Sequence, residues 1–506
     1  MYSKLKTCVL QGLNGHIVDV ETDLSKGLPA FNIVGLPDTA IKESKERVRS
    51  AIKNSEFEFP LNRITINLAP ANLKKDGSQM DLSIAIGILA AAEIVNLPDF
   101  NCVYLGELSL DGSINPIIGA LPMIISMREY GINKFIIPDS NKDECAIIDD
   151  VDIIPVVNLK QVCDFLNGNV TIEAYKGKAY SSNSVSSNVD FSDIKGQEGL
   201  KRAMQIAAAG SHNMLIVGPP GSGKTMSARR LPTILPSLSV EESIEVTKIY
   251  SIAGLLSDNR LITERPFRAP HHSSSNIAII GGGKIPKPGE VSLAHRGVLF
   301  FDELPEFQKN VLEVLRQPLE DGFVHISRVN ASITYPSNFM FVASMNPCPC
   351  GNLGDPFHQC TCSQASIEKY LNKISHPLLD RIDIHIEVLP VNYSDLSKDS
   401  KEISSNDIKN TVEQARLIQK NRNSTKNTIY NANLSNKEIK SICRLSKSAE
   451  LLMAKAFEKY KFSARSYNKI LKVARTIADL DQKEIIDDYH LSEAIRYRSL
   501  DKKYWR

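Results

Sequence analysis

This sequence lacks both long hydrophobic runs and an excess of charge of one sign. The longest apolar stretch extends from Leu82 to Val95, whereas a helix needs about 20 apolar residues to span a bilayer. The formal net charge of the 506 residues is +2, so the chain as a whole is not a general binder of polyanions. Basic residues do gather in residues 401–506, which hold 23 Lys and Arg against 13 Asp and Glu. That excess is compatible with nucleic acid and equally with a solvated helical surface.

The sequence does not indicate a secretory leader or a disulfide framework either. Its first residues, MYSKLKTCVL, lack the apolar core of a signal peptide. The nine cysteines are an odd number, which argues for a reducing compartment. We therefore expect a cytoplasmic protein with no membrane partner. The length predicts about three or four domains.

The first part of the chain, residues 1–172, alternates apolar strands with helical stretches. Arg63–Leu68 and Phe135–Pro138 are predicted to be strands. Asp81–Ala92 is apolar throughout most of its length and is predicted to be a buried helix. These elements indicate a separate folded domain.

A Ser-rich linker, residues 173–189, is predicted to follow this domain. Its segment Ser181–Asn188 carries too little apolar surface to fold alone. In residues 190–395, strand and helix patterns then alternate, which predicts an α/β domain with a parallel sheet. Residues 396–506 have helical periodicity and are predicted to form a C-terminal helical lid domain.

A Gly-rich loop follows directly after the short apolar run Met214–Val217. It matches the pattern G-x-x-x-x-G-K-[ST], whose small residues let backbone N–H groups face phosphate oxygens. In that pattern Lys224 reaches the β- and γ-phosphates and the Thr225 hydroxyl binds Mg²⁺. The sequence therefore predicts a site for ATP and Mg²⁺. Its residues are Gly218, Pro219, Pro220, Gly221, Ser222, Gly223, Lys224 and Thr225.

A second apolar run, Val298–Phe301, ends in two carboxylates about 75 residues further on. Downstream of a phosphate-binding loop this pattern is typical of the acidic strand of an ATPase. Asp302 is predicted to hold the Mg²⁺ shell, and Glu303 to polarise the attacking water. The alternative is a strand that merely ends in acids.

Two further polar residues are candidates for the same chemistry. Asn346 follows the apolar strand Phe339–Ser344 and could orient the water, or it could simply form a turn before the next proline. Arg381 could act on the nucleotide of a neighbouring subunit as an arginine finger. Alternatively, it could pair with one of the two aspartates beside it, Asp380 and Asp383.

The motifs in this chain resemble those of the YifB/ComM family, often called magnesium-chelatase-like AAA ATPases. The resemblance extends over essentially the whole chain, from GLPAFNIVGLPDTAIKESKERVRSAI near the start to ARTIADL near the end. Between these two segments lie RAPHH (Arg268–His272), PGEVSLAHRG (Pro288–Gly297), LFFDELPEF (Leu299–Phe307), MNPCPCG (Met345–Gly351) and LLDRIDI (Leu378–Ile384).

The resemblance implies an AAA+ fold and a homohexameric ring that acts on DNA. Members of ComM type are ATP-driven motors that promote branch migration while incoming single-stranded DNA is integrated during natural transformation. DNA, single-stranded or branched, is then the expected partner, together with recombination proteins. Arg465 lies in FSARS and resembles the sensor-2 position of AAA+ lids, although it could be an ordinary helix-end arginine.

The family also resembles the helix-2-insert clade, which includes the MCM helicases. That likeness places an insert at about residues 263–290 and a hairpin at about 322–336, both facing the pore of the ring. Their cations are candidate phosphate contacts, or else ordinary loop cations. The four candidates are Lys284, Lys287, His325 and Arg328.

Residues 1–172 resemble a Lon-protease-type domain, which uses a serine nucleophile and a lysine base. Aligning the KDG turn puts Gln79 at the nucleophile position, and aligning the later segment puts Pro122 at the lysine position. Neither side chain can perform that chemistry. Ser78 could replace the nucleophile but would still lack its lysine. We therefore expect a scaffold or a DNA-binding element rather than a protease.

Four cysteines fall within fifteen residues, as two C-x-C pairs. Cys348, Cys350, Cys360 and Cys362 could close a tetrahedral Zn²⁺ site, with His358 as a spare ligand. The alternative is a reduced thiol cluster without metal. A structural zinc here would steady the loop that follows Asn346.

The resemblance leaves two functional classes open. A DNA motor is favoured, because chelatase motor subunits resemble residues 190–500 but lack the Lon-like first domain. The alternative is the motor subunit of a magnesium-chelatase-type complex, which remodels a protein partner.

Overall fold

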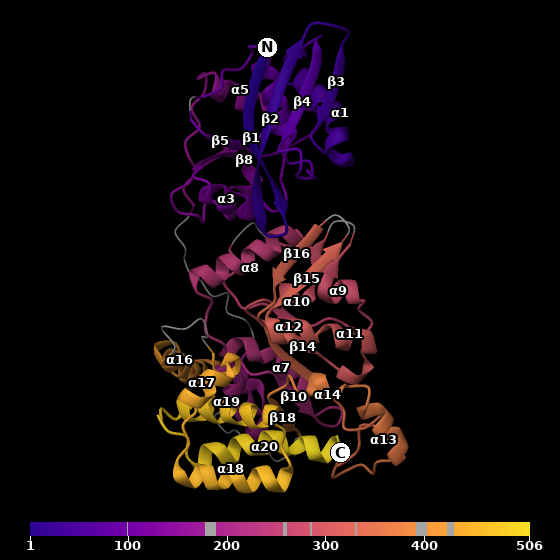
Figure 1. Cartoon of the computed structure of the whole chain (residues 1–506), viewed down its shortest axis with the longest axis vertical. Coiled ribbons are helices and arrows are strands. Elements are labelled where there is room, and N and C mark those ends of the chain that lie inside the picture. The colour runs from indigo at the N-terminus through magenta and orange to yellow at the C-terminus, as the bar shows by residue number, and fades with distance from the viewer. Residues whose placement is uncertain are drawn as a thin grey trace. The chain divides into compact units, whose positions relative to one another are not determined.

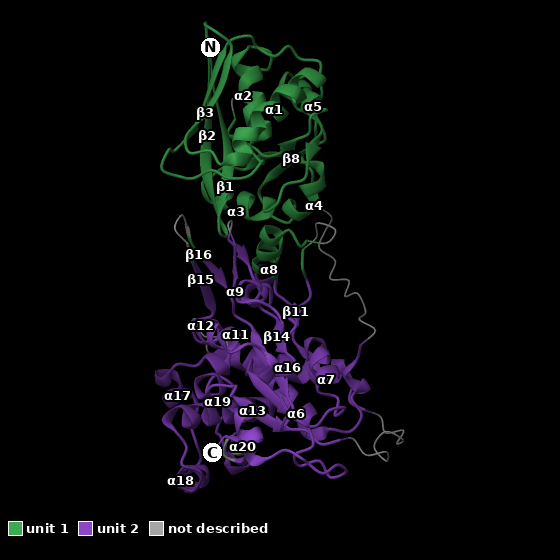
Figure 2. Cartoon of the chain, turned by 90° about the vertical axis from the view of Figure 1, so that its right-hand side faces the viewer, with its two compact units in different colours: residues 1–182, 243–262, 327–333 green, residues 183–242, 263–326, 334–506 purple. Residues whose placement is uncertain are grey.

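The computed structural model describes residues 1–98, 100–177, 189–256, 261–283, 286–328, 331–390, 402–422 and 430–505. For Arg328, Ala331, Ser499, Asp501 and Lys502 the description is limited to the backbone. The chain divides into two compact units, coloured separately in Figure 2. Unit 1 comprises residues 1–182, 243–262 and 327–333, and unit 2 comprises residues 183–242, 263–326 and 334–506. Most of the predicted Ser-rich linker lies outside the described residues.

Unit 1 is built on a seven-stranded mixed sheet of order β3-β4-β2-β1-β5-β8-β9 (Figure 1). The long hairpin β1–β2 and the pair β2–β4 are antiparallel, and the remaining neighbours are parallel. The strands are β1 (Tyr2–Gln11), β2 (Asn14–Ser25), β3 (Ala30–Val34), β4 (Arg63–Ala69), β5 (Cys102–Tyr104), β8 (Lys134–Pro138) and β9 (Asp152–Val156). A small ladder pairs β6 (Glu107–Leu108) with β7 (Ile114–Asn115).

The helices of unit 1 follow from capping and from apolar content. Asp38 caps α1 (Thr39–Asn54) by accepting a hydrogen bond from the backbone N–H of Ile41. Helix α2 (Asp81–Ala91) is buried around nearly its whole circumference, as its almost unbroken apolar sequence predicts. The remaining helices of the N-terminal region are α3 (Ala120–Glu129), α4 (Lys142–Cys145) and α5 (Leu159–Leu166).

Unit 2 contains a five-stranded sheet of order β11-β14-β17-β10-β18, in which all neighbours are parallel. The predicted α/β parallel-sheet fold is thereby confirmed. The three central strands are buried at every residue, which explains their unbroken apolar sequences. The strands are β10 (Met214–Val217), β11 (Phe267–Arg268), β14 (Val298–Phe301), β17 (Met340–Met345) and β18 (Ile384–Glu387).

The helices that connect these strands are mostly short. Before and after β10 lie α6 (Glu198–Gly210), α7 (Lys224–Arg230) and α8 (Val240–Ala253), the last of which crosses from unit 2 into unit 1. The segment between β11 and β14 contains α9 (Asn276–Ile280), β12 (Gly281–Gly282), β13 (Lys287–Pro288) and α10 (Glu290–Leu293). After β14 come α11 (Lys309–Val314), α12 (Arg316–Asp321), β15 (Phe323–Arg328), β16 (Ala331–Pro336), α13 (Gln364–Leu371) and α14 (His376–Leu379).

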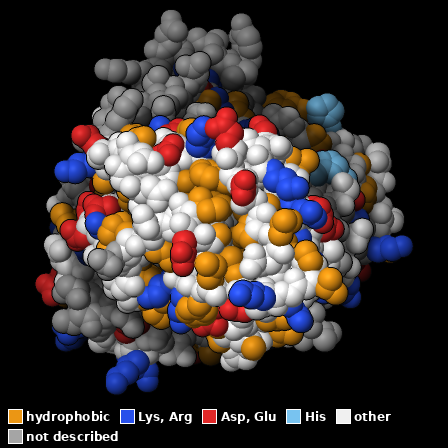
Figure 3. Space-filling view, turned by 90° about the horizontal axis from the view of Figure 1, so that it is seen from above, with side chains coloured by type: hydrophobic (Ala, Val, Ile, Leu, Met, Phe, Trp, Pro, Cys, Tyr) orange, Lys and Arg blue, Asp and Glu red, His pale blue; other side chains and the backbone are white. Residues whose placement is uncertain are grey.

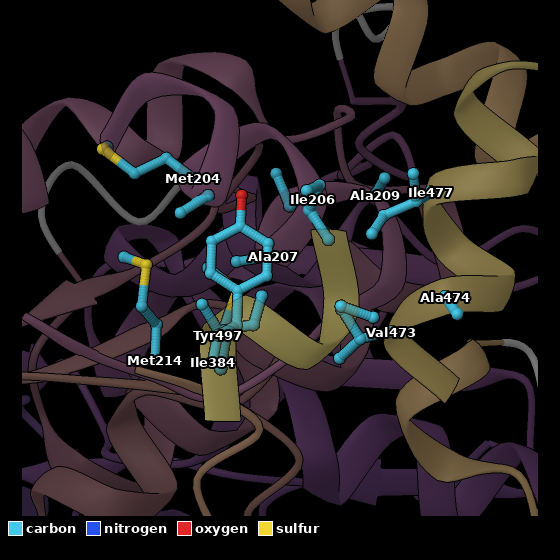
Figure 4. Close-up of a cluster of buried hydrophobic side chains, with 14 of the residues drawn as sticks. Met204, Ile206, Ala207, Ala209, Met214, Ile384, Val473, Ala474, Ile477 and Tyr497 are labelled. Atoms are coloured by element: carbon cyan, nitrogen blue, oxygen red, sulfur yellow. The ribbon is translucent and has the colours of Figure 1, made fainter. Parts of the chain in front are cut away.

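The C-terminal region is helical, as its periodicity predicts. Ser435, Ser446 and Ser463 each cap the helix that follows them. Figure 4 shows side chains of α19 and α20, including Ile477 and Tyr497, packed with α6 and β10 in one buried cluster. This shared core fixes the helical region against the sheet within unit 2. The helices are α16 (Ser405–Arg422), α17 (Asn436–Ile442), α18 (Lys447–Tyr460), α19 (Ala464–Leu480) and α20 (Asp488–Tyr504).

The surface mixes charges of both signs. Figure 3 shows Lys and Arg side chains interspersed with Asp, Glu and hydrophobic side chains on the face seen from above, as the near-neutral net charge leads one to expect. In the described part of the chain, no helix combines the length and the hydropathy that crossing a membrane would require.

Candidate nucleotide site

The Gly-rich loop joins the buried strand β10 to helix α7. Gly221 and Gly223 have φ of +75° and +83°, a backbone conformation that side-chain-bearing residues rarely adopt. Lys224 begins α7, and its Nζ donates to the carbonyls of Gly218 and Pro219, both at 2.8 Å. The lysine thus curls back over its own loop, at the place where a phosphate would lie between the amine and the loop N–H groups.

The acidic strand meets this loop at the same edge of the sheet. Thr225 Oγ1 donates to Asp302 Oδ2 at 2.7 Å, and the Ser344 hydroxyl donates to the other oxygen of Asp302. Glu303, next to Asp302, is exposed, and its φ is +53°. This left-handed turn separates the two carboxylates: Asp302 faces Thr225, while Glu303 is open to solvent. A hydroxyl and a carboxylate side by side are ligands that Mg²⁺ prefers.

Asn346 joins the same group from the strand between the other two. Because β17 pairs with both β10 and β14, its end lies between the loop and the acidic strand. Lys224 Nζ donates to Asn346 Oδ1 at 3.2 Å. Burial lowers the pKa of Lys224 to about 8, although Asp302 and Glu303 pull in the opposite direction. Bound phosphates would therefore contact an ammonium group that is already largely desolvated.

The structure brings together five of the predicted residues: Lys224, Thr225, Asp302, Glu303 and Asn346. Parallel strands with helical crossovers place their carboxyl ends at one edge of the sheet, where ligands commonly bind. Sequence reasoning missed Ser344. It lies in an apolar strand, two residues before Asn346, and its position on β17 beside β14 was the one signal that could have found it.

Arg381 and Arg465 occupy a different place in unit 2. Both line a polar cavity between α12, the segment after α14 and helix α19. None of the described lining residues belongs to the loop 218–225. Lys469 and Lys472 line the same cavity from the next turns of α19, and sequence reasoning missed both of them. Four cations therefore share one polar hollow.

Arg381 is held by groups other than its two neighbouring aspartates. Its guanidinium donates to the carbonyls of Arg316, at 3.0 Å, and Pro377, at 2.7 Å, and it pairs with Glu320. Asp383 instead contacts His212 Nδ1 at 3.2 Å and Lys469 Nζ at 2.9 Å. Pairing of Arg381 with Asp383, one of the alternatives predicted from the sequence, is therefore wrong, because His212 and Lys469 occupy that carboxylate.

The candidate DNA contacts are described only in part. Lys284 lies outside the described residues, and so does the side chain of Arg328 at the end of β15. Lys287 is exposed on β13. His325 is exposed on β15, where its Nδ1 lies 2.7 Å from Thr334 Oγ1. The predicted insert and hairpin touch, because the Tyr335 hydroxyl donates to the Pro286 carbonyl at 2.9 Å.

In unit 1 the residues at the protease-like positions are engaged in local contacts. Gln79 Nε2 donates to the Asp76 carbonyl at 2.9 Å, and Pro122 is buried in α3. The Ser78 hydroxyl bonds to Glu107. Lys75 is buried, and its amine donates to the Pro70 carbonyl. Each of these polar side chains is thus bonded to a group near it in the fold; the loss of the dyad stays a prediction from the residue types at these positions.

The four thiols of Cys348, Cys350, Cys360 and Cys362 converge in space. All four Sγ atoms lie within 4.8 Å of one another, and three of the separations are 3.4, 3.6 and 3.6 Å. Backbone N–H groups that follow the cysteines lower the pKa of Cys350 to about 6, which favours its thiolate. His358 is not part of the cluster: its Nδ1 faces Asp355 at 3.3 Å, so it is not the spare ligand that the sequence suggested.

The strand order, the Gly-rich loop and the acidic strand together define a magnesium-chelatase-like AAA+ fold. Comparison with family models agrees. The description "Magnesium chelatase, subunit ChlI" matches residues 190–396, "Subunit ChlI of Mg-chelatase" matches 20–141, and "Magnesium chelatase, subunit ChlI C-terminal" matches 402–498.

Individual relatives show which branch of these magnesium-chelatase-like proteins the chain resembles. The chain is 42% identical over 494 residues to YifB of Escherichia coli (strain K12), covering 97% of this chain and 96% of the relative. It is 43% identical over 498 residues to the competence protein ComM of Haemophilus influenzae, with the same coverage. The 38 kDa magnesium-chelatase subunit of Rhodobacter capsulatus is 29% identical over 174 residues, which is 31% of this chain and 50% of that subunit. The chain belongs to the YifB/ComM family of magnesium-chelatase-like AAA+ proteins, and this confirms the resemblance drawn from its motifs.

Proposed function

We propose that the chain is an ATP-hydrolysing motor of a homohexameric ring that moves branched or single-stranded DNA. The family suggests ATPase activity, and the convergence of Lys224, Thr225 and Asp302 supports it most directly. When bound, Mg²⁺·ATP supplies a polarised γ-phosphoryl group. Lys224 would hold the phosphates, Thr225 and Asp302 would hold the metal, and Glu303 with Asn346 would orient the water.

Arg381 is proposed to act on the nucleotide of the neighbouring subunit, and Arg465 is proposed to be the sensor-2 arginine of the lid. Their cavity is lined by none of the described residues of the chain's own loop 218–225. Cations in a cavity separate from this loop could stabilise a transferring phosphoryl group if a neighbouring subunit brought its nucleotide to them. This division supports a ring, in which each nucleotide lies between two chains.

DNA is the substrate that the relatives favour. The competence protein ComM matches this chain over 97% of its length, so a role in integrating incoming single-stranded DNA by branch migration is proposed here as well. Lys287 and His325 are exposed on segments that touch through Tyr335 and Pro286. These segments offer cations to a phosphate backbone.

The experiment measures ATP hydrolysis, and migration of a three-stranded DNA junction, with and without single-stranded or forked DNA. A triple Ala variant of Lys284, Lys287 and Arg328 should keep its basal ATPase and lose both DNA stimulation and strand movement. The matched control replaces three exposed lysines of α18 with Ala: Lys447, Lys455 and Lys459. Wild-type strand movement by the first variant would contradict the proposed contacts. Loss in the control alone would place the DNA on the basic C-terminal helices.

The second candidate is the motor of a magnesium-chelatase-type complex. The names of the matching family models favour it. The Rhodobacter subunit, however, matches 31% of this chain, whereas the YifB and ComM relatives match 97%. An ATPase indifferent to every DNA substrate, in a protein that assembles normally, would favour this candidate over the DNA motor.

A structural Zn²⁺ at the four thiols is also proposed. A tetrahedral site with Zn–S bonds of 2.3 Å has sulfur–sulfur edges of about 3.8 Å, whereas a disulfide needs about 2.05 Å. The observed separations of 3.4 and 3.6 Å match the metal site and not the disulfide. Elemental analysis of protein purified without chelator should find close to one zinc per chain. Well under half an equivalent would remove the site.

A further inference from the structure

We infer that the four-thiol metal site is a positioning device for the nucleotide loop, acting through Gly351 on Pro220. The inference rests on the proposed ATPase and zinc site and adds a connection between them. It concerns residues 345–351, which run from the end of β17 into the thiol cluster.

The contact between Gly351 and Pro220 is close and direct. A Cβ atom added at Gly351 would lie 2.5 Å from Cδ and 2.8 Å from Cγ of the Pro220 ring. Real Cβ atoms do not approach so closely, so the glycine backbone lies flat against the proline of the loop. Gly351 is buried, and its N–H donates to the Cys348 carbonyl at 3.0 Å. The turn that carries two of the thiols is therefore the turn that touches the loop.

Two more bonds tie the same segment to the loop. The N–H of Gly218 donates to the Met345 carbonyl at 3.1 Å, and Lys224 Nζ donates to Asn346 at 3.2 Å. The segment thus contacts the loop at its first residue, at its proline and at its lysine. Any displacement of the segment moves the phosphate-binding surface with it.

The far side of the thiol loop has little other support. Phe357 is 64% exposed and the His358 side chain is 71% exposed, so packing contributes little at the tip of this loop, residues 356–359. The thiols of Cys348 and Cys350 lie close to those of Cys360 and Cys362 and so bring the two ends of this loop together. A metal bound by all four thiolates would fix the turn at Gly351, and its loss would free the turn to move away from Pro220.

The test uses full-length variants and separates the contact from the metal. Gly351→Ala keeps all four thiols and forces a methyl group against Pro220. Gly354→Ala is the matched control: Gly354 also has a left-handed φ, +81° against +84°, but its added Cβ would meet nothing nearer than Glu387 at 3.8 Å. Cys360→Ser combined with Cys362→Ser removes half of the ligand set. Zinc content, affinity for a fluorescent ATP analogue, and KM and kcat for ATP are measured for each.

Gly351→Ala should retain one zinc per chain and lose roughly tenfold to hundredfold in nucleotide affinity, since small misplacements of binding groups have effects of this size. Gly354→Ala should keep both zinc and affinity. The double serine variant should lose zinc and affinity together. Gly351→Ala should cost much less affinity in a Pro220→Ala background than in the wild-type background, because the ring that the added methyl group meets is gone. Backbone strain alone would not be relieved in this way.

Equal affinities of Gly351→Ala and Gly354→Ala would overturn the inference, as would a zinc-free serine variant with wild-type affinity. If the serine variant does not fold, the two glycine variants and the Pro220 rescue decide. Wild-type protein that binds zinc but does not hydrolyse ATP would defeat the proposed function and leave the metal site standing. Protein that hydrolyses ATP without bound zinc would defeat the inference and leave the proposed ATPase intact.

Discussion

A buried lysine in each unit donates hydrogen bonds to backbone carbonyls, but the two lysines differ in the other polar groups around them. The amine of Lys75 in unit 1 donates to the Pro70 carbonyl, and that of Lys224 in unit 2 donates to the carbonyls of Gly218 and Pro219. Burial lowers the pKa of both. For Lys75 burial is the one cause of the shift, whereas Asp302 and Glu303 also act on Lys224.

The difference teaches that burial of a cation does not by itself make a site. At Lys224 three parallel strands end together, so the amide of Asn346 contacts the amine and the carboxylates that follow β14 act on its charge from another strand. Near Lys75, Gln79 contacts the carbonyl of Asp76 in the same turn. Groups that satisfy one another locally are not available to a substrate.

The largest effect that would sharpen this comparison is expected at the nucleotide loop. Lys224→Ala should abolish ATP binding, because the phosphates lose their cation. Glu303→Gln should still bind ATP but turn it over at least about a hundredfold more slowly, since the water loses its orienting carboxylate. Nucleotide binding by fluorescence and phosphate release measure the two steps. A Glu303→Gln variant with wild-type turnover would remove Glu303 from the chemistry.

Arg381 comes next. Arg381→Ala should slow hydrolysis by about a thousandfold, the lower end for loss of an arginine finger. Mixing these subunits with Lys224→Ala subunits should restore some activity, because certain interfaces then combine an intact loop with an intact arginine. ATPase is followed across mixing ratios, with mixed rings verified by native mass spectrometry. No recovery at any ratio would count against action between subunits.

A smaller effect concerns proton uptake. Lys224 has a pKa of about 8 in the ligand-free pocket, and bound phosphates should raise it. Above pH 8 the free amine is mostly neutral, so ATP binding must take up a proton. Apparent affinity should then fall by up to about tenfold per pH unit. Calorimetry in buffers of different ionisation enthalpy should find uptake approaching one proton at pH 9 and little at pH 7. Absence of uptake at pH 9 would mean that the pKa is not depressed.

The smallest effect is expected in unit 1. Lys75→Met removes a buried ammonium of unit 1 and keeps a side chain of similar length. Because no carboxylate acts on Lys75 as Asp302 acts on Lys224, ATP turnover should stay near the wild-type rate. Thermal unfolding serves as the check that the variant is folded. A loss of turnover comparable with that of Lys224→Ala would break the comparison and give Lys75 a functional role.

Much of unit 2 could be predicted because its motifs and its buried strands are each formed by a few consecutive residues. The loop from Gly218 to Thr225 and the run ending in Asp302 each carry their chemistry within a few residues, and buried parallel strands read as unbroken apolar runs. The N-terminal strands and the buried helix at Asp81 were likewise predicted and confirmed, apart from one residue at the ends of β4, β8 and α2.

What depends on packing between distant segments could not be predicted in this way. That Arg381 and Arg465 line one cavity depends on how α19 packs on the sheet, and no local pattern encodes that arrangement. The bond between Ser344 and Asp302 depends on which strands are neighbours. The contact of Gly351 with Pro220 depends on the path of the loop after Asn346. Each of these joins residues tens to more than a hundred positions apart, where periodicity carries no signal.

The register of strand β17 sets the relative positions of the residues in the nucleotide site. Its last two residues and the residue after it bond to both sides: Ser344 to Asp302 on one side, and Met345 and the following Asn346 to the nucleotide loop on the other. Because side chains alternate along a strand, a slip of one residue would turn Ser344 and Asn346 away together. An insertion among the exposed residues 356–359 would leave this register unchanged. The same insertion within β17 would displace both side chains. A designer who transplanted this site would have to copy the length of one buried strand before copying any catalytic residue.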